Sequence, residues 1–127
     1  VGKNMDVQFC LGDVLADGQQ DYIALSEQSL VTYTYTKSGR FEPVMDFVYP
    51  MAQDSIFTIE MAGLGKSLIG SYNEINATIH LVKGDGEVYP GFPLAGSTAF
   101  TVSPLFGTNT RILVVANGES IYAYKLQ

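Results

Sequence analysis

Several residue types that build functional sites are scarce in this sequence. Its 127 residues include no Trp, one Cys and one His, and seven Lys and Arg stand against thirteen Asp and Glu. The net charge of −6, with no basic run, argues against nucleic acid, whose phosphates need clustered cations, and against a polybasic membrane-surface site. A single Cys cannot form a disulfide within the chain, and there is no Cys/His cluster for zinc or haem.

Long apolar runs are also missing. No stretch approaches the roughly 18 residues of a membrane-spanning helix, so we expect no direct insertion into a membrane. The opening residues VGKNMDVQF contain no apolar segment of a signal peptide. Cys10 stands between Phe9 and Leu11, which predicts a small buried side chain and not a reactive thiol.

Residues that favour β-strands are abundant by contrast. Val, Ile, Thr, Tyr and Phe recur in short runs separated by Gly, and no run of ten residues has a helical period with caps. The sequence therefore predicts one all-β domain over residues 1–127, made of antiparallel strands. The predicted strands are Phe9–Val14, Tyr22–Ser26, Leu30–Thr36, Phe41–Val48, Ser55–Met61, Ser67–Ser71, Thr78–Lys83, Phe100–Leu105, Ile112–Ala116 and Ser120–Leu126.

The strands recur in three units, at residues 9–55, 56–99 and 100–127. The units begin at Phe9, Ile56 and Phe100, and their short apolar strands contain Ile23, Ile69 and Ile112. A period in the mid-forties with about four strands per unit is typical of β-propeller blades. The third unit ends after its third strand, so the chain predicts a partial propeller. Either two copies complete a six-blade ring as a homodimer, or the remaining blades belong to a longer parent chain.

Three aspartates mark the loop between the first two strands. Asp13, Asp17-Gly18 and Asp21, followed by the apolar run Tyr22-Ile23-Ala24-Leu25, resemble the calcium loop of FG-GAP and VCBS-type propeller repeats. Those repeats read D-x-D-x-D-G-x-x-D before an apolar strand. The segment Tyr89-Pro90-Gly91-Phe92-Pro93-Leu94 is similar to a P-G-W-P element of such propellers. The absence of Trp departs from quinone-dependent (PQQ-like) propeller enzymes, whose repeats carry it.

The resemblance implies a degenerate calcium site at Asp13, Asp17 and Asp21. Ca²⁺ takes six to eight oxygen ligands around a tight turn, which Gly18 would supply, but Leu15 occupies the second acid position and offers none. The corresponding loops of the second and third units lack the acids while keeping Gly. Asp-Gly is also a common turn dipeptide, so a purely structural loop stays open as the alternative. No other cofactor is expected.

Aromatic side chains offer a second candidate site. Tyr33, Tyr35, Tyr122 and Tyr124 lie on corresponding third strands. Together with Tyr72, Tyr89 and Phe92 they would form either a sugar-binding platform or packing between blades, and packing is favoured.

The lone His80 lies in an alternating strand without a nucleophile or acid beside it, which predicts a strand-surface position. Lys83-Gly84-Asp85-Gly86-Glu87 lacks the phosphate-loop spacing and predicts a hairpin turn.

No catalytic set is recognisable, so the expected function is non-enzymatic. The sequence favours a binding or scaffold module that mediates protein–protein interaction. A carbohydrate-binding, lectin-like module and an inert fragment of a larger propeller enzyme are the alternatives. By resemblance, such proteins are extracellular, periplasmic or on the cell surface, and they bind proteins or polysaccharides.

Overall fold

The computed structural model of the chain describes residues 7–60, 66–104 and 110–126, which contain eleven β-strands and no helix. Every pair of neighbouring strands is antiparallel, which confirms the predicted all-β, antiparallel class. No helix in these residues is long and apolar enough to cross a membrane. The strands are β1 (Val7–Gly12), β2 (Asp21–Ser26), β3 (Ser29–Tyr35), β4 (Phe41–Val48), β5 (Ser55–Glu60), β6 (Ser67–Asn73), β7 (Thr78–Val82), β8 (Leu94–Ala95), β9 (Thr101–Pro104), β10 (Arg111–Asn117) and β11 (Ser120–Leu126).

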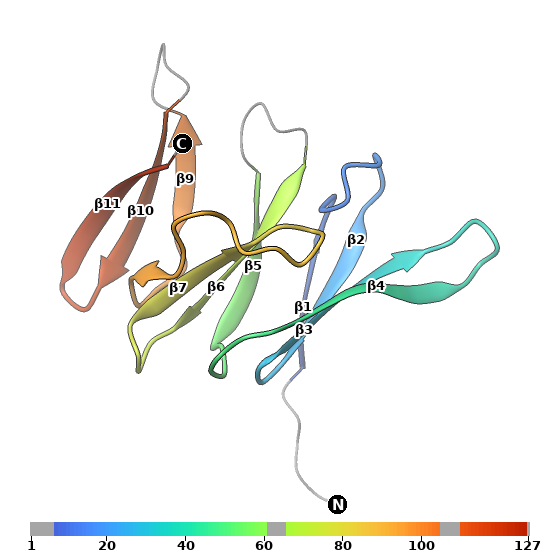
Figure 1. Cartoon of the computed structure of the whole chain (residues 1–127), viewed down its shortest axis with the longest axis horizontal. Coiled ribbons are helices and arrows are strands. Elements are labelled where there is room, and N and C mark those ends of the chain that lie inside the picture. The colour runs from blue at the N-terminus through green and yellow to red at the C-terminus, as the bar shows by residue number, and fades with distance from the viewer. Residues whose placement is uncertain (1–6, 61–65, 105–109, 127) are drawn as a thin grey trace, which may run out of the picture.

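The strands form three sheets that follow one another along the chain (Figure 1). The first sheet has the order β1-β2-β3-β4 and the second has the order β5-β6-β7-β8. The third sheet contains only β9, β10 and β11, with β10 in the middle. Each strand pairs with its neighbour in sequence, so all three sheets are simple meanders. Among the described residues, no strand continues the third sheet beyond β11.

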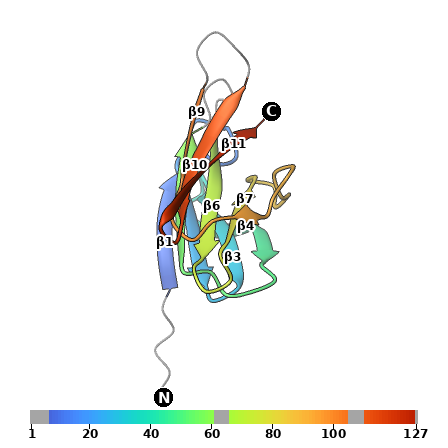
Figure 2. The same ribbon diagram turned by 90° about the vertical axis from the view of Figure 1, so that its left-hand side faces the viewer.

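The three sheets are stacked face to face, and Figures 1 and 2 show their first strands along one edge of the stack. Strand β1 contacts β5, and β5 contacts β9. The Thr58 hydroxyl on β5 donates a hydrogen bond to the Leu11 carbonyl on β1 (3.0 Å), and the Gln8 side-chain amide donates to the Asp54 carbonyl (2.6 Å). Gln8 precedes Leu11 on β1, and Asp54 likewise precedes Thr58. Strands β1 and β5 therefore run in the same direction.

Two apolar clusters fill the spaces between the sheets. The second sheet contributes to both, because neighbouring residues of a strand point to opposite faces. On β6, Ile69 belongs to the cluster shared with the first sheet, whereas Leu68 belongs to the cluster shared with the third. Val82 and Leu81 on β7 divide in the same way, and all four side chains are fully buried. The second sheet is therefore covered on both faces.

This arrangement corrects the prediction for His80. The sequence predicted a strand-surface histidine, but His80 is only 2% exposed. It lies on the same face of β7 as Val82, toward the first sheet, and its ring packs edge-on against Tyr49 with centroids 5.3 Å apart. The prediction was wrong because alternation separates the two faces of a strand but does not reveal that both are covered.

The first predicted strand and the equivalence of the apolar strands also need correction. Strand β1 ends at Gly12 and not at Val14, whose N–H leaves the ladder to bond the Asp21 carboxylate. Ile23 and Ile69 are not equivalent, because both face the same intersheet cluster from opposite sides. The cross-strand partners show which residues are equivalent. Leu11, Thr58 and Val102 each lie two residues after the start of their unit, and their partners on the next strand are Tyr22, Ile69 and Leu113, respectively. Tyr22, and not Ile23, is therefore the equivalent of Ile69.

Lys83 to Glu87 forms the predicted turn, closed by the Gly86 N–H to Lys83 carbonyl bond of 3.0 Å. The short strand β8 was not predicted, since Pro93 precedes it and it has only two residues. Cys10 was predicted to be buried, but it is only half-buried, against the apolar cluster between the first and second sheets. Residues 61–65 and 105–109, which include Met61, Leu105 and most of the two later Gly-containing loops, lie outside the described residues.

Candidate functional site: the aspartate loop

The loop between β1 and β2 is folded around the carboxylate of Asp13. Its two oxygens accept hydrogen bonds from the backbone N–H groups of Asp17 (3.0 Å) and Gly18 (2.9 Å). Ala16 and Gly18 have φ angles of 60° and 83°, in the left-handed region that glycine tolerates best. The chain therefore reverses tightly at Asp17-Gly18, as the Asp-Gly dipeptide predicts.

Asp21, the first residue of β2, is fully buried. Its Oδ2 accepts the N–H groups of Val14 (3.1 Å) and Leu15 (3.3 Å), which the loop leaves without ladder partners. Its Oδ1 is also buried and has no hydrogen-bond partner. A buried carboxylate oxygen without a partner is costly, so it identifies a position where a cation or a proton would be stabilised.

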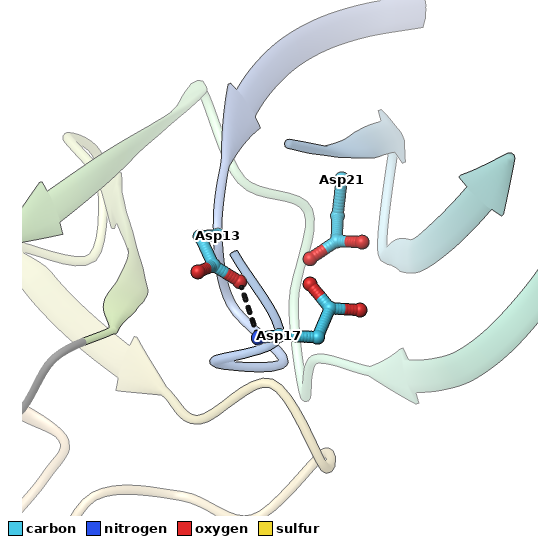
Figure 3. A group of neighbouring side chains, drawn as sticks. All are labelled: Asp13, Asp17 and Asp21. Carbon is cyan, nitrogen blue, oxygen red and sulfur yellow. Dashed lines mark hydrogen bonds between the residues drawn. The ribbon is translucent and has the colours of Figure 1, made fainter. Parts of the chain in front are cut away.

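Asp17 completes the group from the exposed tip of the loop (Figure 3). Its Oδ1 accepts the N–H of Gln19 at 3.0 Å, and its side chain also interacts with that of Asp13. Ligand oxygens of Asp13, Asp17 and Asp21 all lie within 4.8 Å of one another. The structure thus brings together the three acids that the sequence predicted, while Leu15 points an apolar side chain to the surface.

The carboxylates have different electrostatic environments. Burial raises the pKa of Asp21, and the nearby carboxylates of Asp17 and Asp13 add to this, partly offset by the N–H groups of Leu15 and Val14. Burial would also raise the pKa of Asp13, but the N–H groups of Gly18 and Asp17 outweigh it and hold that pKa below its usual value. Of the two, Asp21 therefore takes up a proton more readily than Asp13.

The same loop links the first sheet to the second. The Asp13 carbonyl accepts the N–H of Ser67 at 2.9 Å, and Val14 is buried in the intersheet cluster. Gly84, in the β7–β8 connection, packs directly on the backbone of Val14. By holding the Val14 and Leu15 N–H groups, Asp21 fixes the segment that joins the two sheets. The aspartates consequently have a structural role whether or not a cation is bound.

The donor set fits a calcium ion only in part. Asp21 offers one buried oxygen without a partner, Asp17 offers an exposed carboxylate, and Asp13 offers lone pairs beside its two N–H bonds. Ca²⁺ prefers six to eight oxygens, so water and loop carbonyls would have to supply the remainder. With Leu15 in place of an acid, these residues fit a weak calcium site.

The aromatic candidates lie mainly in the apolar cluster between the second and third sheets. Tyr89 is buried there, and Tyr72 and Phe92 pack partly buried against the same cluster. Phe92 stacks near Phe100, with ring centroids 6.3 Å apart. Of the third-strand tyrosines, Tyr124 packs against this cluster and donates its hydroxyl to the Ala95 carbonyl at 2.8 Å.

Two groups of side chains were not anticipated from the sequence. Between the first and second sheets, the Thr32 hydroxyl and the Nδ1 of His80 are buried without a hydrogen-bond partner, and the hydroxyls of Tyr49 and Ser71 are buried next to each other. On the open face of the first sheet, Phe41 stacks on Tyr33 (4.8 Å) and meets Tyr22 edge-on (5.3 Å). Only the second group had a sequence signal, namely the aromatic residues on alternating strand positions.

No family model, curated protein or solved structure matches this chain.

Proposed function

We propose that this chain is a β-propeller segment of about three blades, similar to FG-GAP and VCBS-type repeats, and that it acts as a non-enzymatic binding or scaffold module. One observation supports this proposal most directly. Three consecutive meander sheets are stacked face to face with β1, β5 and β9 adjacent along one edge. In propellers, the first strand of each blade lines the central axis in this way.

The binding end of the module is proposed to be the one where β1, β5 and β9 end. The aspartate loop leaves from this end (Figure 1), and connections at the ends of a rigid sheet scaffold are where binding residues concentrate. The proposed ligand is a protein, and an exported location follows from the same family resemblance.

A loop exchange tests this assignment. Residues 15–19 would be replaced by a Gly/Ser linker, which keeps Asp13 and Asp21 in place, and protein partners captured by wild type and variant would be compared. We expect partners that bind saturably to wild type and are lost with the loop. The matched control is Ile75→Ser in the β6–β7 turn, which lies 92% exposed and outside the proposed end. Equal capture by all three proteins would contradict the assignment.

Carbohydrate binding is the alternative function, because Tyr35 remains exposed on β3. Exposed tyrosine rings are suitable platforms for sugars. A panel of soluble polysaccharides would show saturable binding that Tyr35→Ala abolishes, whereas no binding by wild type would remove this alternative. The third alternative, an inert fragment of a propeller enzyme, expects no binding in either assay.

We further propose that the aspartate loop binds Ca²⁺ weakly, on the basis of the buried, unpartnered Oδ1 of Asp21. A ligand that binds only the folded state raises its melting temperature by mass action. Excess calcium should therefore raise the melting temperature relative to chelator. Asp17→Asn keeps an oxygen for the Gln19 N–H but removes one charge, so the calcium effect should shrink. Identical melting of wild type in calcium and chelator would end this part of the proposal.

A further inference from the structure

None of the described residues covers one broad apolar face of the first sheet. Strand pairing places Leu11, Tyr22 and Tyr33 in one row across this face, and Phe9 lies in the next row. Phe9 is 70% exposed, and Val7, Leu11, Tyr22, Phe41 and Val48 are exposed as well. Asp46 is the charged strand residue of this face. We call it the β1–β4 open face, and contiguous apolar surface of this kind marks an interaction site.

Equivalent faces of the other two sheets are buried. Phe9 corresponds to Ile56 and Phe100, and Tyr22 corresponds to Ile69 and Leu113, by strand pairing. Ile56 and Ile69 are covered by the first sheet, and Phe100 and Leu113 by the second. In each later sheet, this face is therefore packed on the sheet that precedes it in the chain. The β1–β4 open face has the same construction and lacks that preceding sheet.

The other end of the stack has the complementary surface. On the third sheet, Val114 pairs with Ala123 and Ala116 pairs with Ile121, and all four point away from the second sheet. Ile121 is 78% exposed, and the charged strand residue here is Lys125. This β9–β11 open face corresponds to the faces of the first two sheets that cover the next sheet. It offers aliphatic side chains and a positive charge, whereas the β1–β4 open face offers bulky aromatic rings and a negative charge.

We infer that a second copy of this chain covers both faces, with the β1–β4 open face of each copy packed on the β9–β11 open face of the other. This inference rests on the proposed stack of propeller blades and names its partner. Three sheets from each copy would close a six-sheet ring through two identical contacts. A two-fold axis then relates the copies, and no apolar sheet face is left open.

The size of the faces is sufficient for a stable dimer. Strands spaced about 4.8 Å apart with about 3.3 Å per residue give the smaller face, with strands of 4, 7 and 7 residues, roughly 290 Å² of projected area. Two such contacts cover roughly 570 Å² on each copy, near the lower end of the about 600–1,000 Å² per partner of specific interfaces.

Light scattering coupled to size exclusion tests the inference on residues 1–127. We expect a mass of twice 13.8 kDa for wild type. Phe9→Glu and Ile121→Glu, one on each open face, should each shift the protein to a folded monomer, because a desolvated charge opposes apolar packing. Ile75→Glu is the matched control, since Ile75 is 92% exposed on neither face, and it should stay dimeric. Far-UV circular dichroism and cooperative melting identify folded variants, and either face variant suffices if the other fails to fold.

Several results would overturn the inference. A monomeric wild type, a dimer that persists in a folded Phe9→Glu or Ile121→Glu variant, or open oligomers that grow with concentration would each exclude the closed pair. A folded monomeric wild type would exclude the dimer but not the proposed blade stack. The stack is tested separately by Gly84→Ala, which adds a methyl group at the contact between the first and second sheets of one chain. Dissociation of Ile75→Glu to the same extent as the face variants would also contradict the assignment of these two faces.

Discussion

Replacement of Gly84 by Ala tests the contact between the first and second sheets with a single methyl group. A Cβ at Gly84 would meet the backbone of Val14, with the Val14 carbonyl carbon 2.6 Å away and the carbonyl oxygen nearer still. Backbone atoms cannot turn aside as the end of a flexible side chain can. The aspartate loop, which holds Val14 in place through Asp21, would have to move away from the second sheet.

The expected magnitude follows from two opposing effects. Gly→Ala at a position without strain stabilises a protein by about 0.4–1 kcal/mol through the unfolded chain. Overpacking of a tight contact costs about 1–3 kcal/mol, and the rigid neighbour here places Gly84→Ala at the upper end. We therefore expect a net loss of about 2 kcal/mol in the free energy of unfolding.

Urea denaturation of wild type and variant measures this loss directly as a lower midpoint at unchanged slope. Gly96→Ala is the comparison variant, at the contact between the second and third sheets. There an added Cβ meets methyl groups of Val115 (2.8 Å) and Ile79 (3.1 Å). These methyl groups can shift, so its loss should be smaller. A Gly84→Ala variant as stable as wild type would refute the close contact between the two sheets.

Two further predictions concern the cores. Leu113 is fully buried in the cluster between the second and third sheets, so Leu113→Ala should lower the free energy of unfolding by about 2–5 kcal/mol in urea titrations. Ile75→Ala at the exposed turn should change it by less than about 0.5 kcal/mol. Equal effects would contradict the core assignment. Burial lowers the pKa of His80 from its usual 6.5, so the unfolded chain binds the proton first as pH falls below that value. The free energy of unfolding should therefore fall as the pH drops below about 6.5, and His80→Phe should weaken this dependence; an unchanged dependence would contradict a buried neutral imidazole.

Local patterns in the sequence were sufficient to predict the antiparallel all-β class and most of the strands, although not β8. Alternation in Val31 to Tyr35, and Gly or Asp-Gly turns between apolar runs, correspond to observed strand and turn positions. The faces were less predictable. His80 and Ile69 lie in strands whose both faces are buried, because a sheet on each side covers the second sheet. Periodicity assigns residues to a face, but burial depends on what packs against that face.

The aspartate loop shows the same limit. The spacing of Asp13, Asp17 and Asp21 predicted their grouping, and the structure places their oxygens within 4.8 Å. The spacing did not predict that Asp21 is fully buried or that it holds the Val14 and Leu15 N–H groups. That role depends on Val14 leaving the ladder to enter the core between two sheets, which is a tertiary effect.

Proton NMR tests most directly whether the three sheets of this chain pack face to face. His80 is the only histidine, so its ring resonances are readily identified. We predict nuclear Overhauser contacts between the rings of His80 and Tyr49, whose centroids are 5.3 Å apart, and between the rings of Phe57 and Phe100, at 5.0 Å. The first pair reports the contact between the first and second sheets, and the second pair the contact between the second and third. Contacts from His80 only to residues of its own sheet, with an imidazole that titrates at its ordinary pKa, would contradict the stacked arrangement.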